Sequence, residues 1–553
     1  MKVINLRTCL FSSVLIFISL FFQPTYSLTQ MLPHTLTVTV GDYGMIHPAG
    51  DQVVFGGDHT WEITPDSGYE VDTLTDNGED NKSELISNQY TLTDIRANHT
   101  IVVTFKLTTG DSKEDSDFIC ADSADDLKNA LSTAATNGKN DEIRIVQGTY
   151  NGNFIYSPQE ENKLTIKGGY TADCASREEA PSETILDGDS AGSVLTTEPH
   201  QGADFELDGV TIQNGANDPG LNIVAGEGDV VLANNIIINN TSAGIGGASV
   251  ETNASAVITN NIIMDNSSGY YGGGIYINGS GTATFSGNTV SNNKASGAAG
   301  VWVGAHVTAT LFNNVIINNM AEWYGGGIYF DRIHENYENE PSTPIILTNN
   351  TIVSNSPDGF LLHFTNNDDE ADIFNNIIWN NQERDLDIDN DPDGDEAPVT
   401  SLRIFNNNFD QSEGRISVEI PFSIDPSNLN SQNPKFADPD NGDYRLKQSS
   451  PCIEAGSNSA SGLPVADKDG NTRITPPDGN ADMGAYEYVA EKGNLDTDNS
   501  VNLRDAILAI QAVVGENTAI RTDYVSSEAD VSGDGKAGLE EAIYALEIIS
   551  EIR

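Results

Sequence analysis

The amino-acid sequence predicts a mainly β protein built around a right-handed parallel β-helix, a solenoid of stacked coils. Seven segments repeat apolar residues, Asn and further apolar residues, with spacings of 26, 27, 26, 36, 26 and 31 residues. The apolar runs are β-branched and break at Asn or Gly after three to five residues, which favours strands over helices. A period in the twenties is typical of a solenoid. The aligned residues are Asn235, Asn261, Asn288, Asn314, Asn350, Asn376 and Asn407.

The aligned asparagines have a physical role in such a solenoid. Parallel coils stack about 4.8 Å apart, so that identical residues form a ladder along the axis. Each Asn amide can then donate to one neighbouring coil and accept from the other. Asn also tolerates the left-handed backbone that the corners require. The apolar residues stay in register over all seven segments, which argues against an Asn-rich disordered tract.

The chain is strongly acidic, with 82 Asp and Glu against 27 Lys and Arg and a formal net charge of -55. Such a protein repels phosphate backbones and anionic lipids, so we expect neither nucleic acids nor membrane surfaces as partners. The mean hydropathy of -0.33 excludes a multi-span membrane protein, and no integral membrane protein is expected. Divalent cations are the natural partners of this charge.

The first 27 residues have the pattern of a secretory signal peptide. Two basic residues precede an apolar run from Leu10 to Phe22, which is too short to span a bilayer. We therefore expect a secreted or cell-surface protein, in which disulfides are permitted. Cys120 and Cys174 lie in one N-terminal subregion and are the expected pair, which leaves Cys452 over.

Residues 35–107 alternate short β-type runs with turn signals, and residues 108–118 read as a polar linker. The strings TPDSGYEV and ANHTIVVTF resemble a divergent InlB B-type repeat, a small β module that usually serves as a spacer or stalk. No chemistry is assigned to this part.

The predicted solenoid with its caps occupies residues 119–488. Its strings GGA and GGGIY, beside FSGN and LFNNV, resemble repeats of polymorphic outer-membrane proteins and of the pectate-lyase-like β-helix superfamily. LTIKGGY and ETILDG resemble the N-terminal cap and first coils of secreted β-helix proteins. NPKFADPDNGDYRLKQSSPCIEAG, closing with DMGAYEY, is similar to their choice-of-anchor C-terminal region. Caps protect the open ends of a solenoid from edge-to-edge pairing.

Residues 490–553 contain two twelve-residue loops, 494–505 and 530–541, each followed by a helix-forming run. Oxygen-bearing side chains at positions 1, 3 and 5 and a carboxylate at 12 are the pattern of a calcium loop. Ser500 and Lys536 would contribute backbone carbonyls, and Gly535 the turn. The expected Ca²⁺ ligands are Asn494, Asp496, Asp498, Ser500, Asp505, Asp530, Ser532, Asp534, Lys536 and Glu541.

The two loop–helix units resemble a type I dockerin module. The resemblance implies calcium binding and a cohesin-like protein partner. Cellulosomal dockerins contact cohesins partly through hydroxyl residues at loop positions 10 and 11, where this chain has Leu503 with Arg504 and Leu539 with Glu540. Because these positions lack hydroxyl residues, the contacts to a cohesin-like partner would differ from those of cellulosomal dockerins. The calcium ligands are not affected.

Strand alternation predicts which solenoid side chains point outward. In the string GIYIN the isoleucines would point inward, so that Tyr276 points outward. The same register aligns Tyr276, Trp302 and Tyr329 in one row, expected to form an exposed aromatic ladder and to be the substrate-binding residues for a glycan. Rings that stabilise one another across strands are the alternative reading. Asp387 lies further along this row and is a fourth candidate.

The neighbouring outward row aligns Asp331, His363 and Asp389, the candidate catalytic residues. A carboxylate–His–carboxylate row could hold Ca²⁺ or carry out general acid–base chemistry on a glycan. Asp331 and Asp389 would be roughly 10 Å apart, near the upper end for an inverting carboxylate pair. A solvated acidic face is the plainer alternative.

Two functions from different classes remain open on the sequence. The first is a calcium-binding β-helix protein that binds glycans or surface partners without catalysis. The second is a polysaccharide lyase or glycoside hydrolase attached through the C-terminal module. The chain lacks polygalacturonase-like motifs, which favours the first.

Overall fold

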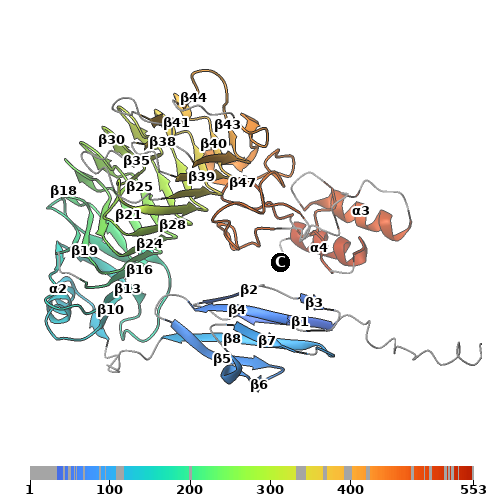
Figure 1. The fold of residues 1–553 in the computed structure, drawn as a ribbon, viewed down its shortest axis with the longest axis horizontal. Coiled ribbons are helices and arrows are strands. Elements are labelled where there is room, and N and C mark those ends of the chain that lie inside the picture. The colour runs from blue at the N-terminus through green and yellow to red at the C-terminus, as the bar shows by residue number, and fades with distance from the viewer. Residues whose placement is uncertain are drawn as a thin grey trace, which may run out of the picture. The chain divides into compact units, whose positions relative to one another are not determined.

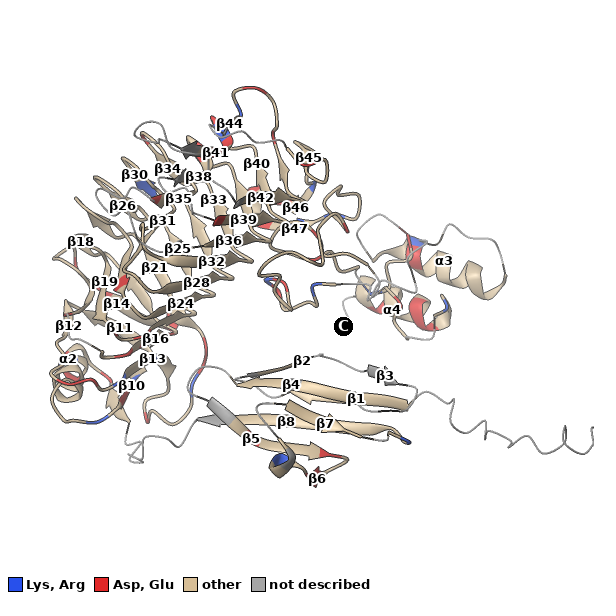
Figure 2. Ribbon diagram, viewed as in Figure 1, with Lys and Arg blue, Asp and Glu red and all other residues tan. Residues whose placement is uncertain are grey.

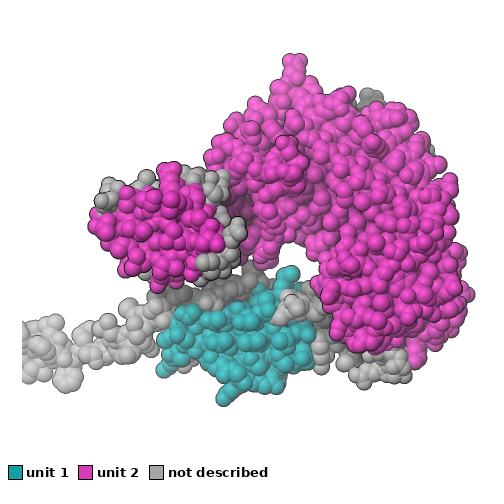
Figure 3. Space-filling view, turned by 180° about the vertical axis from the view of Figure 1, so that it is seen from behind, with its two compact units in different colours: residues 1–114 teal, residues 115–553 magenta. Residues whose placement is uncertain are grey.

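The computed structural model describes residues 34–107 with short gaps, 118–198, 202–331, 344–364, 370–390, 401–418, 424–474, 479–490 and, with gaps, 492–550. Two compact units divide the chain, residues 1–114 and 115–553 (Figures 1 and 3). The predicted signal peptide lies outside the described residues. Within the described part, no helix is both long and apolar enough to cross a membrane.

The first unit is a small β module. Its strands form two sheets, in the orders β3-β1-β8-β5-β6 and β2-β4-β7, around a core that includes Trp61, Tyr90 and Ile101. The elements are β1 (His34–Val40), β2 (Gly44–His47), β3 (Gln52–Val54), β4 (His59–Pro65), β5 (Tyr69–Asp76), β6 (Glu79–Asp80), η2 (Lys82–Glu84), β7 (Gln89–Leu92) and β8 (His99–Leu107).

The second unit is dominated by a parallel β-helix, as the sequence predicts (Figure 1). Each coil adds one strand to each of three long parallel sheets. The first long sheet contains β9 (Ile119–Ala121), β10 (Asp141–Val146), β13 (Leu164–Tyr170), β16 (Phe205–Asp208), β20 (Val230–Ala233), β24 (Ser255–Thr259), β28 (Thr282–Ser286), β32 (Thr308–Phe312), β36 (Ile345–Thr348), β39 (Glu370–Phe374) and β42 (Ser401–Phe405).

The second long sheet contains β11 (Gly148–Asn151), β14 (Thr184–Asp187), β17 (Thr211–Gln213), β21 (Ile236–Ile238), β25 (Ile262–Met264), β29 (Thr289–Ser291), β33 (Val315–Ile317), β37 (Thr351–Val353), β40 (Ile377–Trp379), β43 (Asn408–Phe409) and β45 (Leu429–Asn430). The third long sheet contains β12 (Phe154–Tyr156), β15 (Leu195–Thr197), β19 (Leu221–Gly226), β23 (Ala248–Thr252), β27 (Ile275–Asn278), β31 (Val301–Val303), β35 (Ile328–Asp331), β38 (Asp358–Phe364), β41 (Arg384–Asn390) and β44 (Ile416–Val418).

A short fourth sheet lies in the turn between the second and third strands of five coils. Its strands are β18 (Ala216–Asn217), β22 (Thr241–Ser242), β26 (Ser267–Ser268), β30 (Lys294–Ala295) and β34 (Met320–Ala321). Inside the coils, alternate strand residues such as Leu221 and Ile223 in β19 are buried. These inward side chains form one continuous apolar core along the solenoid, which is the main source of its stability.

The predicted Asn ladder is present and buried. From Asn235 to Asn407, each side-chain Nδ2 donates to the Oδ1 of the ladder Asn in the next coil at 2.9–3.2 Å, and the ladder ends on Asn428. Each Nδ2 also donates to a carbonyl of the preceding coil, as Asn314 does to Phe285 at 2.7 Å. A second ladder runs through Asn240, Asn266, Asn293, Asn319, Asn355 and Asn381 to Asp385.

The left-handed corner belongs to a different Asn from the ladder Asn, so the prediction that one residue serves both purposes is wrong. The residue before each ladder Asn has the positive φ, for example 55° at Asn234 and 58° at Asn313. Gly287 takes this place in one coil, with a φ of 65°. The Asn–Asn doublets of the sequence therefore combine a turn residue with a buried ladder residue.

The N-terminal end of the solenoid is covered by helix α2 (Ala124–Ala134), which buries Leu127 and Leu131 against the first coils. Ser123 caps this helix by accepting the Asp126 N–H at 3.2 Å. Cys120 and Cys174 form a disulfide, as expected, with an S–S distance of 2.05 Å. The short helix η3 (Pro181–Glu183) follows.

Residues 433–474 and 479–488, the flanking strap, pack along the side of the solenoid. The strap contains β46 (Phe436–Asp438), η4 (Pro439–Asn441) and β47 (Asp443–Leu446), and its apolar side chains cover the second long sheet. The left-handed corner asparagines hold it by donating to its carbonyls: Asn313 to Ala466, Asn349 to Asp482, Asn375 to Ser457 and Asn406 to Ala455, at 2.8–3.1 Å.

The strap also carries a buried ion pair and the remaining thiol. Arg473 Nη1 lies 2.7 Å from Glu487 Oε1, and Arg473 Nη2 donates to Asn313 Oδ1 at 2.6 Å. Cys452 is a buried free cysteine, and burial raises the pKa of its thiol to about 12. The chain ends in the helices α3 (Leu503–Val513) and α4 (Leu539–Ile549).

Replacement of one ladder residue tests the role of the buried amides. We expect Asn314→Ala to lower the free energy of unfolding by about 2–4 kcal/mol, because the buried Asn288 N–H loses its acceptor and the Phe285 carbonyl loses the donor that Asn314 supplies. The matched control is Asn260→Gly, a corner position where the next coil already has Gly287. Thermal and urea unfolding give both values, and equal losses would contradict the assigned roles.

Candidate functional site

The third long sheet brings the predicted aromatic row together. Tyr276 pairs with Trp302, and Trp302 pairs with Tyr329, in adjacent strands. The ring centroids of Tyr276 and Trp302 are 4.2 Å apart, and those of Trp302 and Tyr329 are 6.4 Å apart. The row continues through Leu361 to Asp387, as the register predicts.

The expectation that the three rings form the exposed layer is wrong. Tyr329 is only 5% exposed, while Tyr276 and Trp302 are half-buried. Further rings pack against them: Tyr271 lies 5.1 Å from Trp302, and Tyr324 lies 5.2 Å from Tyr329, between ring centroids. The predicted ladder is therefore the lower layer of a larger cluster.

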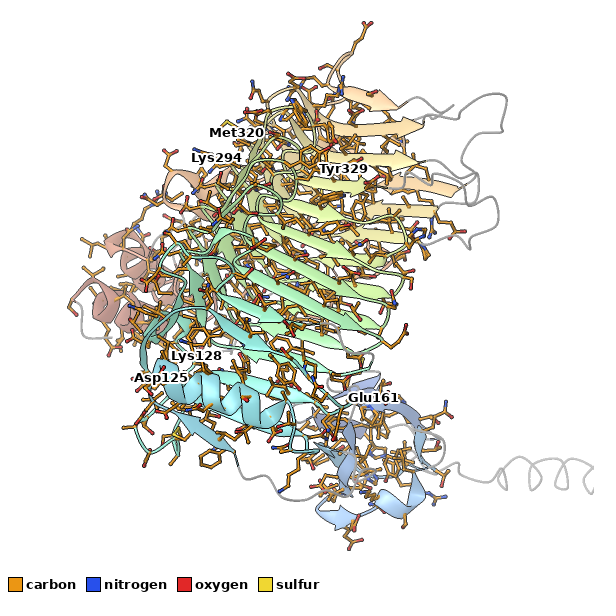
Figure 4. The ribbon with its side chains drawn as sticks, turned by 90° about the vertical axis from the view of Figure 1, so that its left-hand side faces the viewer. Asp125, Lys128, Glu161, Lys294, Met320 and Tyr329 are labelled. Carbon is orange, nitrogen blue, oxygen red and sulfur yellow. A yellow bond between two sulfur atoms is a disulfide. The ribbon has the colours of Figure 1, made fainter. Side chains whose placement is uncertain are left out.

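The upper layer comes from the turns that precede the glycine triplets of two coils. Tyr270 and Trp323 are 53% and 55% exposed, and their centroids are 6.3 Å apart at an interplanar angle of 86°. Together the two layers form what we call the aromatic cluster: Tyr270, Tyr271, Tyr276, Trp302, Trp323, Tyr324 and Tyr329. Figure 4 labels Tyr329 of β35, together with Lys294 and Met320 of the short fourth sheet.

A glycine makes the upper layer continuous. Tyr271 and Tyr324 are two coils apart, yet their ring centroids are separated by only 6.1 Å. The coil between them has Gly297, where an added Cβ would lie 2.7 Å from Tyr271 Cε1 and 3.3 Å from Tyr324 Cε2. Any larger residue there would force the two rings apart.

The phenols of Tyr276 and Tyr329 stay neutral over the physiological range. Burial, followed by the charge of Asp331, raises the pKa of Tyr276 to about 12. The same two causes raise the pKa of Tyr329 further, and Tyr329 is hydrogen-bonded to Asp331. The cluster therefore offers aromatic faces together with hydroxyl groups that can donate hydrogen bonds.

The predicted acidic row is adjacent in the backbone. Asp331 pairs with His363, and His363 pairs with Asp389. The side chains of His363 and Asp389 lie outside the described residues, as does the insertion after Asp331. Asp387 is nearly buried and forms an ion pair with Arg384, so its carboxylate already has a cationic partner.

Asp358 is a buried carboxylate that the sequence reasoning missed. It is 2% exposed, and its Oδ1 has no hydrogen-bond partner among the described residues. Burial, followed by the charge of Asp387, raises the pKa of Asp358 to about 6. It opens β38 beside Arg384 of β41. The turn-type string SPDG that contains it gives no sign of burial.

Three residues of loop two lie around the Tyr524 hydroxyl: Asp530, Lys536 and Glu541. The Tyr524 hydroxyl lies 3.4 Å from Asp530 Oδ1 and 3.5 Å from the Lys536 carbonyl oxygen, and it is also hydrogen-bonded to Glu541. Loop positions 1, 7 and 12 thus surround one point. Gly535 has a φ of 74° and donates its N–H to Asp530 Oδ2 at 2.7 Å.

The remaining loop residues are described only in part. Asn494, Asp496 and Asp505 are buried, and Asp505 accepts N–H bonds from Leu495 and Asn502. Ser532 donates to Asp530 at 3.2 Å. In the described part of the chain, no group of three or more His, Cys, Asp or Glu side chains is placed to hold a metal ion. Three predicted ligands lie outside that part: Asp498, Ser500 and Asp534.

Both C-terminal helices expose apolar side chains at the same spacing. On α3 and on α4 these residues recur every three or four positions, which places them on one face of each helix. The exposed residues are Leu503, Ile507, Ile510 and Val513 of α3, and Leu539, Ile543, Leu546 and Ile549 of α4.

The raised pKa of Asp358 predicts a pH-dependent stability difference. Its folded-state pKa lies above the unfolded value of 3.8, so the stability it contributes is present below that value and is lost as the pH rises through about 6. We expect Asp358→Asn to melt at a higher temperature than the parent protein at pH 8, with the difference closing near pH 4. A difference that does not change with pH would contradict the assignment.

A comparison with protein-family models supports the fold. A family model for a right handed beta helix region matches residues 193–319, and no curated protein matches the chain. A mutant of the PL6 family alginate lyase AlyGC is 14% identical with a TM-score of 0.23, over 57% of this chain and 54% of that one. AlyGC itself is 13% identical with a TM-score of 0.17, over 56% and 55%. The chain thus spans about half the length of these structures, and such low similarity carries no conclusion about activity. What the family match and the coordinates share is a right-handed parallel β-helix.

Proposed function

We propose that the protein is a secreted or cell-surface protein that binds glycans through the aromatic cluster, without catalysis. The exposed pair Tyr270 and Trp323, above a layer of supporting rings, is the observation that carries this proposal. Sugar rings present C–H groups on one face and hydroxyls at their edges. Exposed aromatic faces with phenol hydroxyls complement both, and exposed apolar patches on soluble proteins usually mark binding sites.

The solenoid supports this proposal because it is rigid. Binding to a rigid surface requires little ordering of side chains, which favours affinity. The rings of the cluster are held by strand pairing below and by one another above. The N-terminal β module would act as a spacer, in line with its resemblance to InlB B-type repeats.

Glycan binding can be measured with fluorescent polysaccharides of several classes, mixed with the full mature chain in calcium and separated by size-exclusion chromatography. We expect label to co-elute with the protein while the polysaccharide keeps its length. Free elution of every label would contradict glycan binding and would turn attention to protein partners.

A second candidate function is a polysaccharide-degrading enzyme. The adjacency of Asp331, His363 and Asp389 in neighbouring strands favours it, since strand spacing puts the outer two roughly 10 Å apart. In the same experiment an enzyme would move label to smaller sizes. His363→Ala would then abolish the shortening with the fold intact.

We further propose that the C-terminal loops bind Ca²⁺. The convergence of loop positions 1, 7 and 12 around the Tyr524 hydroxyl supports this for loop two, and hard oxygen ligands favour Ca²⁺. The exposed apolar faces of α3 and α4 suit a protein partner of this module, which the dockerin resemblance would make cohesin-like.

Calcium should stabilise the C-terminal module, because its carboxylates repel one another without the cation. We expect chelation to lower the melting temperature of this module and to leave the β-helix transition nearly unchanged. Glu541→Ala should reduce the stabilisation by calcium, while Glu540→Ala, at the preceding residue, should leave it unchanged. Calorimetry that gives the same melting profile with and without chelator would contradict calcium binding.

A further inference from the structure

The sequence around the aromatic cluster contains very few cationic residues. Between Arg177 and Arg332 the chain has one Lys, Lys294, and no Arg. Lys294 lies in β30 of the short fourth sheet, where Figure 2 shows its strand in blue. Arg384, further along the third long sheet, is ion-paired with Asp387.

Two carboxylates, in contrast, belong to the strand and the turn that carry part of the cluster: Asp331 in β35 with Tyr329, and Glu322 beside Trp323. Asp331 acts electrostatically on Tyr271, Tyr276 and Tyr329, so its charge lies close to both layers. Glu322 precedes Trp323 in the chain and is exposed, and it accepts a hydrogen bond from Ser296 at 3.3 Å. A polymer of uronic acids would bring one carboxylate per sugar into this negative field.

The two exposed rings of the cluster lie next to each other at nearly a right angle. Tyr270 and Trp323 come from coils two apart along the solenoid, a rise of about 9.6 Å, and their rings lean to within 6.3 Å of each other over the coil that has Gly297. Figure 4 views the part of the solenoid that carries Tyr329 and Met320. A linear glycan that crosses these coils would meet both rings without a gap.

We infer that the aromatic cluster selects an uncharged polysaccharide and excludes polyuronates, with Tyr270 and Trp323 as the residues that contact the sugar. This inference rests on the proposed glycan binding and adds the chemical class of the ligand. Affinity comes from stacking on the two exposed rings, and selectivity comes from the carboxylates of Glu322 and Asp331, which repel an anionic chain.

The test titrates the full mature chain, in calcium, with size-matched oligosaccharides of a neutral glucan, a neutral xylan and an alginate, followed by calorimetry. We expect binding of a neutral ligand with little dependence on salt. Trp323→Ala and Tyr270→Ala should each weaken it at least about tenfold. Met320→Ala, at a neighbouring apolar side chain that is 48% exposed, should have no effect.

The outcomes separate the inference from the proposed function. Tightest binding of alginate would overturn the selection of an uncharged ligand while keeping glycan binding. Neutral binding that survives both ring substitutions would overturn the assignment of the contact residues. If no oligosaccharide binds, the proposed glycan binding itself is contradicted. Circular dichroism establishes that each variant is folded, and Glu322→Gln should raise the weak affinity for alginate if repulsion is the cause of exclusion.

Discussion

The hydrogen bonds of the two Asn ladders are the interaction on which the rest of this structure depends. Every ladder amide is buried, donates along the axis and accepts from the coil before it. A coil that slipped by one residue would bury an unpaired amide, at a cost of about 1–3 kcal/mol for each lost partner. The ladders therefore fix the register of the coils that they join, from Asn235 onward, and through it the row that stacks Tyr276, Trp302 and Tyr329.

The Asn doublets link the solenoid to the strap. The first Asn of a doublet turns the chain and leaves its side chain outside, and in the last coils this side chain binds the strap. The second Asn points into the solenoid and forms the ladder hydrogen bonds. Two adjacent residues of one type thus serve the corner, the strap and the ladder.

The sequence was sufficient for features that follow from periodicity. The β-helix, the ladder, the outward rows and the Cys120–Cys174 pair all follow from spacing or proximity. The solvent exposure of the aromatic rings could not be predicted from the sequence. Tyr271 and Tyr324 cover the row, and they lie in glycine-rich turns, where strand alternation does not tell which way a side chain points. Burial of Asp358 depends on its neighbours in adjacent coils, such as Arg384. The course of the strap depends on contacts between distant residues, such as Asn349 with Asp482. No local pattern encodes either feature.

The central claim is that the solenoid presents Tyr270 and Trp323 to a glycan. Hydroxyl-radical footprinting of the full chain, with and without a bound oligosaccharide, tests it directly because it reports the solvent exposure of individual side chains. We expect Tyr270 and Trp323 to become protected, while the exposed apolar residues of α3 and α4 stay unchanged. Protection confined to those helices, or to the acidic row at Asp331, would contradict it.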